Sequence, residues 1–134
     1  MTGPLRDKLQ PLRDALLALH KALVDSERAT YEATVGAIQS PNHFLQLLTT
    51  DPWFAWLQAL SQLIVYIDET LDEKKHPYSM ADVDTILKQI RALLAPSETG
   101  NGFPRHYFDA LQRDPNVVMA HSEVIKLLGP RKTK

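Results

Sequence analysis

A seam of leucines near the start of the chain is the feature that most constrains its fold. Its members are separated alternately by four and three residues: Leu5, Leu9, Leu12, Leu16, Leu19 and Leu23. Because an α-helix turns once in about 3.6 residues, this spacing places all six side chains along one side of a single helix. Such a helix must bury its apolar side against other helices, so the spacing predicts an all-α protein.

The rest of the chain divides into further helices with recognisable starts. Three starts pair a capping residue with a proline, at Ser40, Asp51 and Asp114, and Ser79 with Asp82 has the spacing of a capping box. We therefore predict a helical bundle of four principal helices with two short helices between them. The principal helices are expected over 5–38, 52–73, 80–94 and 115–128, and the short ones over 42–49 and 104–113.

Two residues complicate the first helix. Pro11 removes a backbone hydrogen bond, so we expect a kink there or a helix start near Leu9. A straight helix of some 35 residues would span about 52 Å, more than a compact domain of this length. We therefore expect either that its first turns project or that the helix ends early at Gly36.

The densest apolar run lies at 51–73 and contains both tryptophans, Trp53 and Trp56. We interpret this segment as the main wall of the core and its tryptophans as core anchors. If either indole stays exposed it becomes a candidate interface residue, because tryptophan is enriched among the residues that dominate binding energy.

Size and composition limit the classes of function. The 134 residues suit a single domain, in which we expect residues 1–4 and 129–134 to be flexible tails. A net charge of −1 argues against nucleic-acid or membrane-surface binding, and no apolar stretch is long enough to span a bilayer. The chain has no cysteine, which excludes thiolate chemistry and fits a reducing compartment, so we expect a cytoplasmic protein.

One set of polar residues could form a site inside the bundle. His20, Glu27 and Tyr31 lie on one side of the first helix, beside the leucine seam. Asp68 lies on a flank of the 51–73 segment that also carries Ser61, and this flank could face the first helix. His121 lies in the apolar stripe of the last helix. If the five converge, imidazole and carboxylate groups could bind a small ligand, or iron, manganese or zinc.

Other interpretations of these residues remain open. They could form a satisfied structural network that holds the helices in register, or an acid–base pair of one histidine with Glu27 or Asp68. A ferritin-like metal site would need a Glu-x-x-His pair on each of two helices. The chain has one such pair, Glu73 with His76, in a charged turn. We therefore expect no cofactor.

The glycine-rich loop at 95–104 precedes Arg105 and His106 at a helix start. This arrangement suggests an anion contact by these two side chains, although it lacks the glycine spacing of a phosphate-binding loop. The same loop could also gate a ligand pocket.

Residues 16–69 resemble an uncharacterised family of small bacterial helical proteins. The resemblance is carried by LLALHKALVDSERATYE and by SPNHFLQLLTTDPWFAWLQALSQLIVYIDE. It implies a bacterial, cytoplasmic source but no activity, cofactor or partner. Because the sequence has many apolar helix positions and no recognisable catalytic motif, we expect a non-enzymatic bundle that acts through protein–protein contact. It would bind another protein, or form a homodimer along the leucine seam or the tryptophan end.

Overall fold

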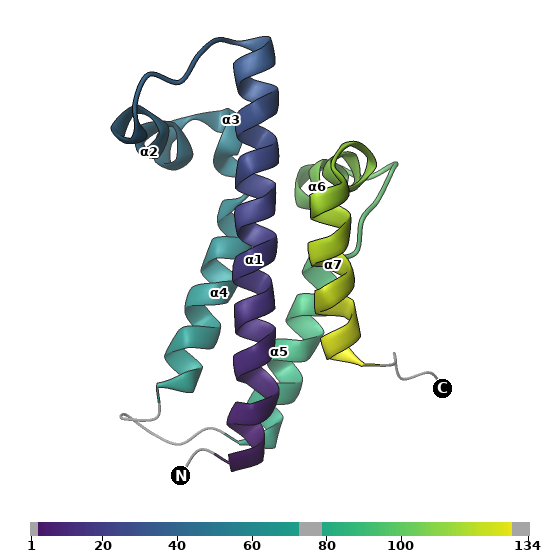
Figure 1. The fold of residues 1–134 in the computed structure, drawn as a ribbon. Helices are drawn as coiled ribbons and strands as arrows, with labels where there is room; N and C mark the ends of the chain where they lie inside the picture. The colour runs from purple at the N-terminus through teal and green to yellow at the C-terminus, as the bar shows by residue number, and fades with distance from the viewer. Residues whose placement is uncertain (1–2, 73–78, 130–134) are drawn as a thin grey trace.

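The computed structural model describes residues 3–72 and 79–129, and this part of the chain is an all-α fold of packed helices (Figure 1). The described helices are α1 (Gly3–Thr34), α2 (Pro41–Thr50), α3 (Pro52–Ala55), α4 (Gln58–Leu71), α5 (Met80–Leu93), α6 (Gly102–Arg113) and α7 (Pro115–Leu128). The predicted fold class is confirmed.

The long helix α1 is the centre of the bundle. It makes its most extensive contacts with α7 and α4, which lie on either side of it in Figure 1. The predicted leucine seam is buried along this helix: Leu9, Leu12, Leu16, Leu19 and Leu23 are all 0% exposed. The side chain of Leu5 lies outside the described part. Removing this apolar surface from water is the main favourable contribution to folding.

The four helix starts that were predicted from capping residues are confirmed. The side chain of Ser40 accepts a hydrogen bond from His43 N, and Asp51 and Asp114 accept from backbone N–H groups two residues later. Ser79 and Asp82 form the reciprocal bonds of a capping box. Each cap satisfies a backbone donor that the helix itself leaves unpaired, which is why these local patterns can be recognised without tertiary information.

The predicted single helix over 52–73 is wrong in one respect, because the chain divides at Trp56 and Leu57 into α3 and α4. Here the N–H of Leu57 donates to the carbonyl of Phe54, three residues back, instead of four. The aromatic side chains on the two sides of the break have different neighbours. Phe54 packs near Tyr31, and Trp56 packs against the ring of Phe103.

The first helix also differs from its predicted range. It begins at Gly3, continues through Pro11 and ends at Thr34 rather than residue 38. Two residues later Gly36 has φ of 154°, a backbone conformation that favours glycine. The chain therefore leaves the helix early, as the length argument allowed.

Some predictions fall outside the described residues. These are the Glu73–His76 pair, the end of the predicted 52–73 helix, and residues 1–2 and 130–134 of the predicted tails. Gly3 and Pro4, also assigned to a tail, are helical. Within the described part, no helix is both long enough and apolar enough to cross a membrane.

Candidate functional site

The first helix faces α4 through polar pairs, as the stripe pattern suggested. Ser61 Oγ lies 2.8 Å from His20 Nε2, and Arg13 Nε donates to Asp68 Oδ1 over 2.7 Å. Both pairs join α1 to α4, and each has partly exposed members. They tie the two helices together at their solvent edge.

Glu27 and His121 have partners elsewhere. Glu27 is 6% exposed, and its Oε2 accepts a 2.6 Å hydrogen bond from Nη2 of Arg113, the last residue of α6. The Nε of Arg113 also donates to the buried Ser26 Oγ at 3.0 Å. On the α6–α7 side, the hydroxyl of Tyr107 lies 2.6 Å from His121 Nδ1.

The five predicted site residues therefore do not form one site. His20, Glu27, Asp68 and His121 each have a hydrogen-bonding partner outside the set, while Tyr31 makes aromatic contacts with Trp53 and Phe54. Within residues 3–72 and 79–129, no three histidine, aspartate or glutamate side chains come together as a metal site would require. These residues join pairs of helices, and they do not converge in the bundle core.

The Ser61–His20 pair superficially resembles a nucleophile and its base. A hydrolase also needs free backbone N–H groups to stabilise the oxyanion that forms during attack. Ser61 lies inside α4, where its own N–H is bonded to the carbonyl of Leu57 at 3.2 Å. The backbone N–H nearest to the hydroxyl is therefore already engaged in the helix and cannot stabilise an oxyanion. The Ser61–His20 pair is better described as a hydrogen bond between two helices.

Burial changes the titration of both paired histidines. It lowers the pKa of His20 and of His121, because a partly desolvated imidazole resists gaining charge. It also raises the pKa of Tyr107, the hydroxyl partner of His121. At neutral pH both histidines are therefore uncharged and suited to hydrogen bonding with a hydroxyl group.

These shifts predict acid sensitivity. Below the unfolded-state pKa of 6.5, the unfolded chain binds protons that the folded chain resists, so stability should fall as pH decreases. We expect urea melts to show this loss as the pH falls below 6.5, and the double variant His20→Asn/His121→Gln to show a flatter pH dependence. Leu45→Asn, at a 57% exposed position on α2 that carries no titratable group, is the control that should keep the wild-type slope. An unchanged slope in the double variant would contradict the assignment.

A small cavity of about 250 Å³ lies where α1, α3 and α6 meet. Its lining includes Glu27, Trp53, His106, Asp109 and Arg113. The ring of His106 stacks on the ring of Trp56, with 5.2 Å between the ring centroids. Both carboxylates in this lining are already paired with arginines, Glu27 with Arg113 and Asp109 with Arg105.

Arg105, one of the two residues of the predicted anion contact, already has partners within the chain. The guanidinium of Arg105 binds Asp109 and also donates to the carbonyl of Glu98 at 2.6 Å. The two tryptophans are half-buried in aromatic contacts, which fits core anchors. Their indole N–H groups are buried and have no hydrogen-bond partner within the described part of the chain.

A second hollow, which the sequence interpretation missed, lies between α4 and α5. It has a volume of about 360 Å³ and we call it the α4–α5 groove. It is lined by Ala59, Gln62, Leu63, Tyr66, Gln89 and Leu93. No lining side chain is charged, and Tyr66 is 39% exposed. Nearby on α4, the uncharged Val65 is 54% exposed.

A signal for this groove was present in the sequence. Residues 52–67 contain no charged side chain, although an exposed helix side is ordinarily rich in charge. Part of this run is buried as predicted, but Gln58, Ala59 and Gln62 face solvent. An uncharged solvent face with an aromatic residue has the composition of an interface core.

The leucine seam, in contrast, is not a surface for self-association. Its residues from Leu9 to Leu23 are fully covered by the other helices of the same chain. A homodimer along the seam would require the bundle to open.

Comparison with known proteins adds no further constraint. No protein-family model, curated protein or solved structure matches this chain.

Proposed function

We propose that this protein is a non-enzymatic helical bundle that acts by binding a helical segment of a protein in the α4–α5 groove. The main support for this proposal is the groove itself, an uncharged and largely apolar hollow that remains open to solvent. Helical partners commonly bind in this way, by laying an apolar stripe into a groove between two helices.

The composition of the groove supports this proposal. Leu63 and Leu93 supply apolar surface, and Ala59 allows another backbone to approach closely. Tyr66 offers a large, partly exposed ring of the kind that dominates binding energy at interfaces. As part of the same proposal we assign the protein to the bacterial cytoplasm, following the sequence resemblance and the lack of cysteine.

A titration followed by NMR tests the proposal. The ligand is a model amphipathic helix of about 18 residues, or about five turns, with a leucine stripe and glutamine elsewhere. We expect the amide resonances of Ala59, Gln62, Tyr66, Gln89 and Leu93 to shift as this peptide is added. Tyr66→Lys should weaken binding at least about tenfold, because it places a charge in the apolar contact.

The matched control is Leu45→Lys, which adds the same charge at a 57% exposed position on α2. It should leave the affinity for the peptide unchanged. Lack of binding, or binding that Tyr66→Lys does not weaken, would overturn the proposal.

A further inference from the structure

The solvent side of α7 carries an apolar stripe that no other described helix covers. Val118 and Ile125 are each 41% exposed and Met119 is 70% exposed, with the small, exposed Ser122 between them. Their spacing places them along one side of the helix, while the opposite side packs against α1. The last helix thus presents the kind of element that a groove between two helices can bind.

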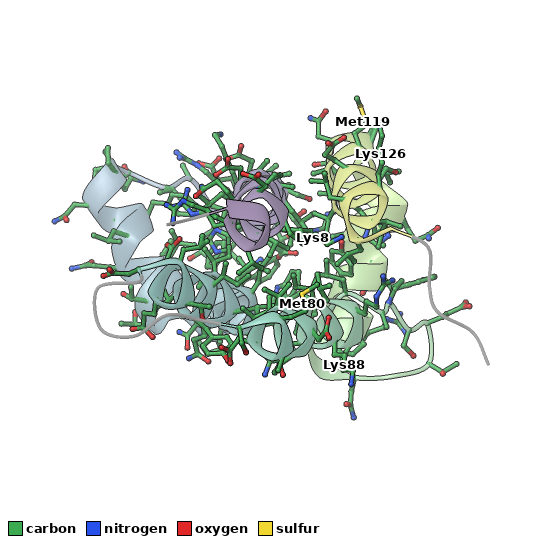
Figure 2. All side chains as sticks on the ribbon, turned by 90° about the horizontal axis from the view of Figure 1, so that it is seen from below. Lys8, Met80, Lys88, Met119 and Lys126 are labelled. Atoms are coloured by element: carbon green, nitrogen blue, oxygen red, sulfur yellow. The ribbon has the colours of Figure 1, made fainter. Side chains whose placement is uncertain are left out.

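This stripe and the α4–α5 groove lie on opposite sides of the molecule. Figure 2 shows Met119 and Lys126 projecting from α7 on one side and Lys88 projecting from α5 on the other. Because the contacts with α1 hold α7 in the bundle, α7 cannot reach the groove of its own chain. An α7 helix that occupied the groove would have to come from a second copy.

Among the described residues, Lys88 and Glu69 are exposed charges next to the rim of the groove. Lys88 immediately precedes the groove residue Gln89 on α5, about 100° further round the helix and toward solvent. Glu69 lies seven residues after Gln62 on α4, which is two helix turns further along the same side. Lys88 and Glu69 are both exposed, and neither has an ion-pair partner among the described residues.

The exposed side of α7 carries the complementary charges. Glu123 and Lys126 follow Met119 by four and seven residues, so they lie beside it on the helix. Both are exposed and without an ion pair in the described part of the chain. In a docked arrangement, Lys88 beside the groove can pair with Glu123 of the bound α7, and Glu69 can then pair with Lys126. Complementary rim charges of this kind set the orientation of a docked helix and favour the correct partner.

Building on the proposed function, we infer that the occupant of the groove is the α7 helix of a second copy of this chain. The stripe around Met119 would contact Leu63 and Tyr66, and the charged residues would pair at the rim. The two surfaces differ, so the interface is heterologous. Each copy that binds a neighbour through its groove keeps its own α7 free for another, and such contacts build open chains or closed rings.

Sedimentation equilibrium over a range of concentrations provides the first test. We expect the average mass to rise above that of the monomer between about 10 μM and about 1 mM, because the contact involves one helix and one groove and is correspondingly weak. Tyr66→Lys blocks the groove and Met119→Lys blocks the stripe. Each variant alone should remain monomeric over the same range, whereas Leu45→Lys should associate like the wild type.

Mixing the two blocked variants provides the decisive result. Tyr66→Lys retains a functional α7 stripe, and Met119→Lys retains a functional groove. An equimolar mixture should therefore form a one-to-one dimer of twice the monomer mass and nothing larger, because no free surfaces remain that can pair. A symmetric interface cannot give this result, since it would place a blocked surface in every mixed pair.

Charge exchange in the same mixture tests the orientation. Adding Lys88→Glu to the Met119→Lys chain should weaken the mixed dimer roughly threefold, as expected for an ion pair at an exposed rim. Adding Glu123→Lys to the Tyr66→Lys chain should then restore the affinity. Lys8→Glu, an exposed change on α1, is the control and should leave the mixed dimer unaffected.

The outcomes separate this inference from the function on which it rests. Three results would each overturn the head-to-tail inference. The wild-type protein could stay monomeric, the two blocked variants could fail to pair with each other, or only one of Tyr66→Lys and Met119→Lys could prevent association. The glutamine-coated leucine peptide is then titrated into Met119→Lys, whose groove no second α7 occupies. Binding there leaves the groove function standing, and lack of binding overturns the groove function itself.

Discussion

Replacing Leu16 by alanine is expected to lower the free energy of unfolding by about 3 kcal/mol, within the range of about 2–5 kcal/mol found for such truncations of buried leucines. Leu16 is 0% exposed in the middle of the seam, where α1 meets its neighbouring helices. Truncation removes apolar contacts and leaves a cavity that the surrounding helices fill only in part.

The adjacent Leu17 provides a matched control on the same helix. It is 38% exposed, so Leu17→Ala should cost less than about 1 kcal/mol. Urea melts of the two variants measure the difference, which should appear in the transition midpoint with an unchanged slope. Similar losses in both variants would contradict the placement of the seam at the centre of the core.

Replacing Arg113 by alanine should cost about 2 kcal/mol. The change leaves the Glu27 carboxylate buried at the α1–α6 contact without its cation, and an unpaired buried charge destabilises the folded state. The side chain of Arg113 is itself 33% exposed. Water can therefore reach part of the space that the side chain leaves, which places the expected effect below the roughly 3–5 kcal/mol of a fully enclosed pair.

Arg105→Ala is the comparison, because the Arg105–Asp109 pair is exposed and lies within one helix turn. Its loss should cost no more than about 0.5 kcal/mol. In the double variant Glu27→Gln/Arg113→Ala the buried charge is also removed, so the loss should be smaller than the sum of the two single changes. Additive losses, or equal effects of Arg113→Ala and Arg105→Ala, would show that the buried pair is not coupled as the geometry indicates.

Stability and association should respond to different residues. The side chains of Leu16 and Glu27 are covered within the bundle, whereas Tyr66 and Met119 lie at surfaces that the fold leaves open. Variants at Tyr66 and Met119 should therefore change binding more than stability. This separation allows loss of binding to be distinguished from loss of folding in the experiments on the groove.

Some of the side-chain contacts could be predicted from the sequence, and others depend on the tertiary structure. The sequence pattern indicated that the polar stripe of α1 could face the Ser61 and Asp68 side of the 51–73 segment, and His20 does meet Ser61. Helical periodicity sufficed for this match because both stripes flank apolar faces that must pack together. Glu27 instead pairs with Arg113, a residue 86 positions away at the end of α6. Nothing in the local pattern of either helix specifies that contact.

Local rules thus determined the helical class, the leucine seam and the capped helix starts, because each depends on residues within about one or two turns of one another. Only the tertiary structure decided the break at Trp56, the partners of Glu27 and His121, and the open α4–α5 groove. Those features depend on how the helices are rotated and ordered around α1. The central segment 51–73 illustrates both cases. Its apolar side was evident from the sequence, whereas its exposed, uncharged side forms a groove only because α5 packs beside it.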